Sequence, residues 1–95
     1  MSESILPNGN ERQCYWCELP FNLERHHIFH GTANRRLAEE DGCWCYLCRK
    51  CHTGTYGVHR SSYMDITLKM KAQAAWEAKY GNREDFRRRY GKSYL

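Results

Sequence analysis

The sequence predicts a small α+β domain that is stabilised by zinc. With 95 residues the chain has room for one core, and a domain of this size has little stability to spare. Six residues are cysteines, and four of these form two Cys-x-x-Cys pairs. Two short segments rich in apolar, histidine or cysteine residues are typical of strands, and a periodic stretch near the end of the chain is typical of a helix.

The composition excludes a membrane protein and favours a polyanionic partner. Hydrophobic residues make up 41% of the chain, and no apolar run approaches the roughly 20 residues that span a bilayer. Fifteen Lys and Arg residues oppose eleven Asp and Glu residues, a net charge of +4 that suits nucleic acid. The first residues lack the basic and apolar regions of a signal peptide, so we expect a cytoplasmic protein with reduced cysteines.

The first half of the chain is expected to hold both strands. Residues 1–13 are polar and lack periodicity, which indicates a flexible tail. A turn around Pro20 follows the first cysteine pair, and an apolar and histidine run up to His30 indicates the first strand. We expect residues 31–42 to form a loop with a single helical turn, and residues 43–48 to form the second strand.

The second half of the chain is expected to be helical after a glycine-rich turn. Apolar residues at helical spacing predict a helix over residues 66–81. Asn82 is a suitable N-cap for a last short helix over residues 83–91. We therefore expect a zinc-bearing core over residues 14–60, against which the C-terminal helices of residues 61–95 pack.

The two Cys-x-x-Cys pairs are the strongest signal in the sequence. Cys14 and Cys17 are separated by 30 residues from Cys48 and Cys51. Each pair directs two thiolates at one ion, and two pairs complete a tetrahedral zinc site without an open position. The gap exceeds the about 15 to 20 residues of a zinc ribbon, so a strand-bearing segment is inserted. Free core thiols or a redox pair are the alternatives, although no βαβ pattern surrounds these cysteines.

The other cysteines and the tryptophans are expected in the core. Cys43 and Cys45 lie on one face of the second strand, either as small buried hydrophobes or as residues that exchange with the zinc ligands. Trp16, Trp44 and Trp76 are expected to be buried, because a chain this short needs its large apolar side chains for packing.

Several histidines lie between the two cysteine pairs or shortly after them in the sequence. His52 follows the last cysteine of the second pair, and His26 and His27 lie between the two pairs. Imidazole can bind a divalent ion or act as a general base near neutral pH. Adjacent strand residues point to opposite faces, so His26 and His27 share one site only if the backbone twists or bulges. We expect His30 to be structural or exposed.

The order of these motifs resembles that of the HNH endonucleases, whose fold is the ββα-metal fold, also called the His-Me finger. The resemblance covers residues 14–60 and rests on the first cysteine pair, RHHIF, YLCRKCH and His59. The C-terminal REDFRRRYGKSYL is similar to the tail of small phage-encoded HNH proteins, including those grouped with recombinase-dependent phage nucleases. The resemblance implies a phage-encoded protein in a bacterial host, with DNA as a partner and a recombinase or another phage or host protein as a further candidate.

The resemblance also implies residue roles in a metal-dependent DNA endonuclease or nickase. His27 is the general base that activates water, while His26 and His52 hold a catalytic divalent ion, either Mg²⁺ or Mn²⁺. That ion stabilises the scissile phosphate. A separate structural zinc is held by the four paired cysteines, Cys14, Cys17, Cys48 and Cys51.

One position departs from the family pattern. The place of the central Asn of the family is taken here by Cys43, and Asn34 either fills the missing role or is a turn residue. His59 is a further metal ligand, a phosphate-orienting residue or a helix cap. The departure motivates an alternative function, a catalytically weak or inactive zinc module that binds nucleic acid or a protein partner, such as a phage accessory or inhibitor protein.

Basic residues near the histidines are candidates for nucleic-acid contacts. Arg25 precedes the histidine pair, and Arg35 and Arg36 lie in the segment between the expected strands. The run from Arg87 to Arg89 either contacts phosphate or forms a solvated helix face, where cations interact favourably with the helix C-terminus.

Overall fold

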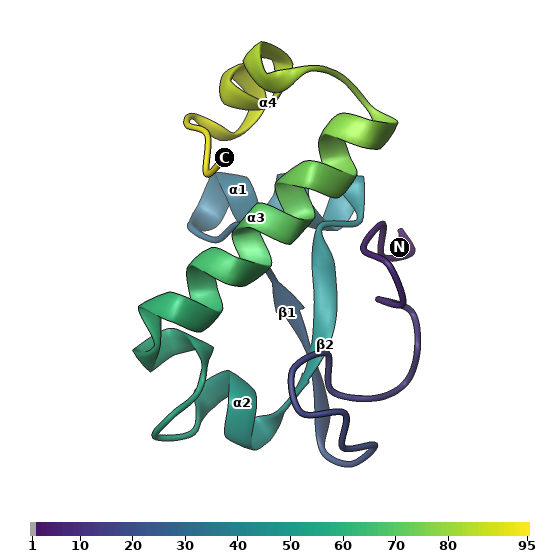
Figure 1. Ribbon diagram of the computed structural model, residues 1–95, viewed down its shortest axis with the longest axis vertical. Coiled ribbons are helices and arrows are strands. Elements are labelled where there is room, and N and C mark those ends of the chain that lie inside the picture. Colours follow the sequence, from purple (N-terminus) through teal and green to yellow (C-terminus); the bar gives the residue numbers. More distant parts are fainter. Residues whose placement is uncertain (1) are drawn as a thin grey trace.

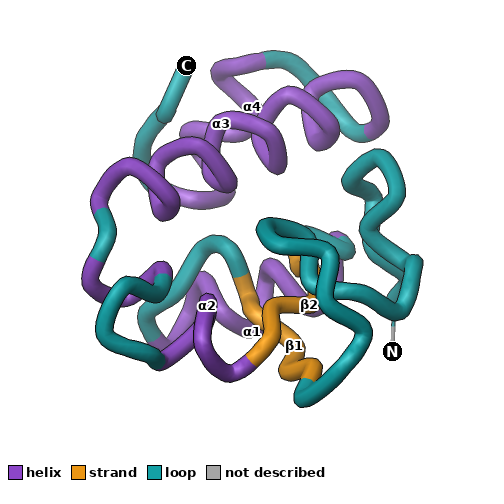
Figure 2. The backbone as a smooth tube through the Cα atoms, turned by 60° about the horizontal axis from the view of Figure 1, so that its bottom comes forward, coloured by secondary structure: helices purple, strands orange, loops and turns teal. Residues whose placement is uncertain are grey.

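The computed structural model describes residues 2–95 and shows a small α+β domain. The strands and helices, in chain order, are β1 (Leu23–His27), α1 (Thr32–Asp41), β2 (Trp44–Cys48), α2 (Arg49–Thr53), the 3-10 turn η1 (Val58–Arg60), α3 (Ser62–Lys79) and α4 (Arg83–Tyr90). The long helix α3 crosses the sheet (Figure 1). Figure 2 shows α3 and α4 as one layer, facing a second layer that holds the strands, α1 and α2. None of the helices over residues 2–95 has the length and apolar character needed to cross a membrane.

The two expected strands pair in antiparallel fashion. His26 lies opposite Cys45, and His27 lies opposite Trp44. Directly opposed residues share a face of the sheet, so His26 and Cys45 point to one face while His27 and Trp44 point to the other. The ring of Trp44 meets that of Tyr46 edge-on at 5.1 Å between centroids, as expected for residues on one face.

Helix α1 occupies the segment that was expected to be a loop with a single turn. It runs for ten residues between two glycines with positive φ, Gly31 at 92° and Gly42 at 79°. Gly42 closes the helix in the left-handed conformation, and its N–H donates to the carbonyl oxygen of Ala38. Good helix formers fill the segment, but its apolar face consists of little more than Leu37 and Ala38, too few to give a clear period.

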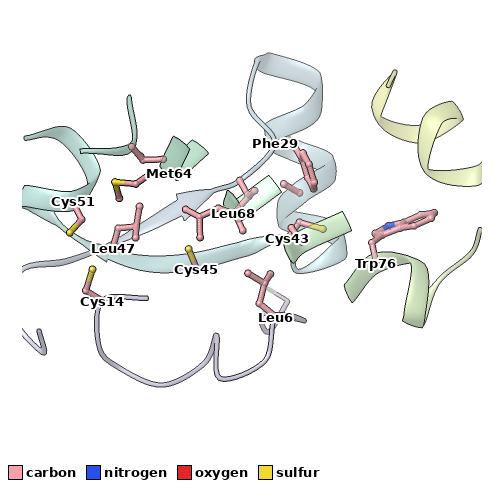
Figure 3. Close-up of a cluster of buried hydrophobic side chains, with 14 of the residues drawn as sticks. Leu6, Cys14, Phe29, Cys43, Cys45, Leu47, Cys51, Met64, Leu68 and Trp76 are labelled. Carbon is pink, nitrogen blue, oxygen red and sulfur yellow. The ribbon is translucent and has the colours of Figure 1, made fainter. Parts of the chain in front are cut away.

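The N-terminal segment packs against the domain, whereas residues 1–13 were expected to form a flexible tail. Residue 1 lies outside the described residues. Leu6 is only 3% exposed and belongs to the core, where Figure 3 shows it beside Cys43. The N–H of Ile5 donates to the carbonyl oxygen of Gly42 at 2.9 Å. The hydroxyl of Ser4 donates to the carbonyl oxygen of Trp44 at 2.6 Å. These long-range contacts leave no periodic signal in the sequence.

The C-terminal helices form where the sequence places them, with an earlier start for α3. Ser61 caps α3, because its hydroxyl accepts a hydrogen bond from the N–H of Met64. Asn82 and Asp85 form a reciprocal capping box at the start of α4. The side chains that these helices bury in the shared core are Met64, Leu68, Ala72, Trp76, Phe86 and Tyr90.

Most of the expected core residues are buried. Cys43 and Cys45 are fully enclosed, which confirms that they are small buried hydrophobes, and burial raises the pKa of the Cys43 thiol to about 12. Trp44 and Trp76 are buried as well. The expectation for Trp16 is wrong, since this side chain is 38% exposed. It lies in the loop that carries the first cysteine pair, outside the main core.

A buried carboxylate joins three helices. Asp41, the last residue of α1, accepts hydrogen bonds from the indole N–H of Trp76 at 2.9 Å, the hydroxyl of Tyr90 at 2.8 Å and Nε of Arg89 at 2.6 Å. The hydrogen bond to Asp41 raises the pKa of Arg89. Arg89 is therefore part of the fold, while Arg87 pairs with Glu84 on the surface of α4.

We predict that Asp41→Asn will lower the free energy of unfolding by about 2 to 4 kcal/mol, because an amide cannot accept all of these hydrogen bonds and leaves Arg89 without its partner. Urea unfolding followed by circular dichroism measures the change. Glu84→Gln, which removes a surface carboxylate from α4, is the control and should leave the midpoint unchanged. Equal effects of the two substitutions would contradict the proposed role of Asp41.

Candidate metal centres

The four paired cysteines converge in the structure. Their Sγ atoms all lie within 4.8 Å of one another, and those of Cys17 and Cys48 are 3.6 Å apart. A tetrahedral zinc site with Zn–S bonds of about 2.3 Å has S···S separations of about 3.8 Å, so the spacing fits a zinc ion. The separation is far above the about 2.05 Å of a disulfide. We call Cys14, Cys17, Cys48 and Cys51 the cysteine cluster, which could hold a structural zinc.

Local backbone contacts position the cysteine cluster. The N–H of Tyr15 donates to the carbonyl oxygen of Tyr46 at 2.7 Å, which ties the first cysteine pair to β2. Figure 3 shows the sulfur atoms of Cys14 and Cys51 facing each other from this loop and from α2. Burial opposes ionisation of Cys14, but nearby backbone N–H groups, Cys17 first among them, lower its pKa to about 7. Burial raises the pKa of Cys17 and that of Cys51, so Cys14 is the thiol of this group whose environment favours the thiolate that a metal ion requires.

Three histidines form a second cluster on the sheet face that points inward. His26 on β1, His52 on α2 and His59 in η1 each offer one ring nitrogen, and these atoms lie within 4.8 Å of one another. The ring centroids are 4.9 to 5.8 Å apart. We call these residues the histidine cluster. It brings together His26 and His52, which were expected to act at one ion, and adds His59.

The central histidine of this cluster is buried without a polar partner. His26 is 2% exposed, and its Nε2 has no hydrogen-bond partner among residues 2–95. Burial, and then the neighbouring His52 and His59, lower the pKa of His26 to about 3. The ring is therefore neutral, which is the form that binds metal ions. An unpaired buried nitrogen is costly unless a ligand satisfies it, so the cluster fits a bound cation.

A carboxylate orients the second histidine. Nδ1 of His52 lies 2.8 Å from Oε1 of Glu24, which leaves Nε2 of His52 free to bind an ion. Such carboxylate–histidine pairs orient the ligands of many metal sites. The hydrogen bond from His52 lowers the pKa of Glu24. Glu24 was not among the predicted residues, although its position two residues before His26 on one strand places both on the same face.

The donor atoms of the histidine cluster bear on the identity of the ion. Mg²⁺ prefers oxygen ligands, whereas imidazole nitrogen suits Zn²⁺, Ni²⁺ and similar transition ions. The cluster offers three imidazoles and no carboxylate oxygen within the same group. The expected Mg²⁺ is therefore a poor match to these side chains, and Mn²⁺ is the weakest binder of the transition series.

His27 lies on the opposite face of β1 and is held by a second carboxylate. Its Nε2 is 2.7 Å from Oε1 of Glu39 on α1, and Nη1 of Arg25 is 2.7 Å from Oε2 of the same carboxylate. The guanidinium of Arg25 also lies over the ring of Trp44, 3.7 Å from its centroid. Burial opposes ionisation of Glu39, but the hydrogen bonds from His27 and Arg25 lower its pKa overall.

The two adjacent histidines meet at the edge of the strand. His26 and His27 belong to opposite faces of β1, yet both line one cavity of about 210 Å³, which His52, His59 and Arg35 also line. His27 therefore borders the cavity of the histidine cluster from the opposite face of β1.

The remaining candidate residues lie at the margin of this site or away from it. Asn34 donates from Nδ2 to the carbonyl oxygen of Tyr90, a contact between α1 and α4. His30 is exposed, as expected, and lies 3.3 Å from a carboxylate oxygen of Asp65. Arg36 lines a neighbouring cavity on α1 together with Glu39 and Glu40.

Comparisons with models of protein families, with curated proteins and with solved structures found no match for this chain. The resemblance to HNH endonucleases therefore rests on the order of the sequence motifs. Any function has to be argued from the geometry of the two clusters.

We predict that one zinc ion per chain will survive a short exposure to a chelator and that Cys17→Ser will abolish this retention. Cys17 is exposed, so its replacement should destabilise the chain only if it binds metal. Atomic emission after gel filtration, together with thermal unfolding, measures both effects. Cys45→Ala, which changes a buried cysteine outside the cluster, should keep the zinc. Loss of zinc in both variants, or in neither, would contradict the assignment of the cysteine cluster.

Proposed function

We propose that the protein is a metal-dependent DNA endonuclease or nickase of the HNH type, with a ββα-metal core formed by β1, β2 and α2. One observation carries the proposal. Three imidazoles, one of them buried without a partner, converge in a cavity that also contains His27, a histidine held by a carboxylate. A cation site beside a positioned general base is what metal-assisted hydrolysis of a phosphodiester needs.

The chain's own residues have distinct roles in this proposal. His26, His52 and His59 hold the ion through ring nitrogens, and the ion, when bound, stabilises negative charge on the scissile phosphate and its leaving oxygen. His27 donates its Nε2–H to Glu39, so the acceptor that takes a proton from the attacking water is Nδ1. Glu39 is a positioning residue, because it fixes both the ring orientation and the tautomer of His27.

The charge of the chain and of the cavity wall supports DNA as the substrate. The chain carries a net charge of +4, and Arg35 lines the cavity that holds the histidines. A positively charged surface attracts the phosphate backbone irrespective of sequence. A phage origin, a location in the bacterial cytoplasm and a recombinase or other phage or host partner follow from the family resemblance and belong to the same proposal.

The alternative function is favoured by the position of the asparagine. Cys43 stands where the family has its central Asn and is fully buried. Asn34 cannot replace it while it donates to the carbonyl oxygen of Tyr90. A catalytically weak or inactive zinc module, including an accessory or inhibitor protein, would retain both metal clusters. It would bind DNA with a strong salt dependence and leave the DNA intact.

We predict that the protein nicks supercoiled plasmid when supplied with a transition ion and that His27→Ala lowers the rate by about 10² to 10⁴, the usual contribution of a general base. His26→Ala should abolish nicking because the ion is lost. Calorimetric titration with Zn²⁺, Ni²⁺, Mn²⁺ and Mg²⁺ is the companion measurement, and His27→Ala should bind the ions as the parent does. Nicking that survives His27→Ala would refute the assignment of the base.

A second prediction separates the enzyme from the inactive module. Asn34→Ala should keep the nicking rate within about twofold of the parent at a temperature where both proteins are folded, since Asn34 does not line the cavity of the histidines. A loss of nicking in this variant would place Asn34 in the catalytic site and would contradict the geometry described above. Absence of nicking with every ion, combined with retained DNA binding, would favour the module.

A further inference from the structure

We propose that Arg35 and Arg60 each bind one of the two phosphates that flank the scissile phosphate, so that the site recognises three successive phosphates of one DNA strand. The inference rests on the proposed function and specifies its substrate. A small phosphodiester would use only the centre of such a site, whereas an internal position in a DNA strand would use all of it.

Two cavities adjoin at the histidine cluster and together form one groove. The cavity of about 210 Å³ contains Arg35 together with His26 and His27. A larger cavity of about 400 Å³ contains Arg60 and the start of α3. His30 and His59 line both cavities, so the two spaces meet at these side chains. The candidate cation site therefore lies in the smaller cavity with Arg35, and its His59 also borders the larger cavity, which Arg60 lines.

The charges along the groove suit phosphate at both ends. Arg25 also lines the smaller cavity, but Glu39 engages its guanidinium. Arg35 and Arg60 are exposed, and no carboxylate of residues 2–95 lies within ion-pair distance of either. A guanidinium without an internal partner is free to bind phosphate through two parallel hydrogen bonds.

One carboxylate in the groove has its charge offset. Asp65 lines the larger cavity, where a free carboxylate would repel a phosphate. Its Oδ2 lies 2.8 Å from Nζ of Lys69, and its Oδ1 lies 3.3 Å from Nε2 of His30. These contacts offset the negative charge of Asp65. Ser62 adds a hydroxyl donor to the same wall, so the larger cavity can accept an anion beside Arg60.

The position of the two arginines in the chain explains why they would read different phosphates. Arg35 comes from α1, whereas Arg60 follows His59 directly in η1. His59 of the histidine cluster lines both cavities, whereas His26 and His52 line only the smaller one with Arg35. Arg35 and Arg60 therefore approach the cation site from different cavities. The proposal assigns each to one side of the cleaved bond.

The test uses a thymidine tetranucleotide, because its three phosphates can fill three subsites in only one register. The His27→Ala protein, loaded with Zn²⁺, serves as the parent, so that binding is measured without cleavage. Fluorescence anisotropy compares the normal strand with strands in which the first or the third phosphate is replaced by a neutral methylphosphonate. Either replacement should weaken binding about fivefold, the effect of one exposed ion pair.

Arginine variants of the same protein complete a double-mutant cycle. Arg35→Ala should weaken binding of the normal strand by a similar factor. In this variant, one of the two methylphosphonate replacements should no longer weaken binding further. In Arg60→Ala, the other replacement should no longer do so. Arg87→Ala, whose arginine pairs with Glu84 on α4, is the matched control and should keep both sensitivities. Additive effects of arginine and phosphate changes would overturn the proposal, as would unchanged binding in both arginine variants.

A turnover measurement separates this inference from the proposed function. In protein with His27 intact, Arg35→Ala and Arg60→Ala should slow cleavage of the tetranucleotide more than hydrolysis of bis(4-nitrophenyl) phosphate, because that compound has no flanking phosphates. If the protein with native residues hydrolyses neither compound, the nuclease proposal fails while the binding cycle still decides the role of the arginines. Equal losses on both compounds would overturn the inference.

Discussion

The convergence of four cysteine Sγ atoms joins the N-terminal loop to the end of β2 and to α2. Cys17 and Cys48 are 31 positions apart in the chain, and their Sγ atoms are 3.6 Å apart. Cys48 ends β2, Cys51 lies in α2, and His52 follows it directly. A zinc ion at the cysteine cluster would thus fix α2 against the sheet that carries His26. Metal–thiolate bonds also supply free energy of folding, which a core of this size provides only sparingly.

The histidine cluster, by contrast, costs stability in the absence of an ion. It buries a ring nitrogen of His26 without a partner and places three imidazoles in mutual contact. The surrounding structure has to hold this arrangement in advance. Glu24 does so from β1 through a hydrogen bond of 2.8 Å to His52, whereas Glu39 on α1 holds His27, outside the cluster, at 2.7 Å. The two clusters together use four of the six cysteines and three of the five histidines of the chain.

Short-range patterns in the sequence predicted part of this arrangement. Three of these patterns span only a few residues each, and the structure agrees with them. They are the spacing within each cysteine pair, the alternation in β2 and the capping residues of α4. The contacts that were missed connect distant parts of the chain. Glu39 meets His27 from a helix that was expected to be a loop, and Leu6 enters the core from a segment expected to be flexible. Such contacts depend on the complete fold and leave no local periodicity.

Cadmium NMR of the ¹¹³Cd-substituted protein distinguishes two separate metal sites from one mixed site, because the chemical shift of this nucleus separates sulfur ligands from nitrogen ligands. We expect two resonances from one chain, one typical of four thiolates and one typical of imidazole nitrogen. His59→Ala should remove only the second resonance, since His59 belongs to the histidine cluster alone. A single resonance of mixed sulfur and nitrogen character, or loss of both resonances in His59→Ala, would contradict the separation of the two sites.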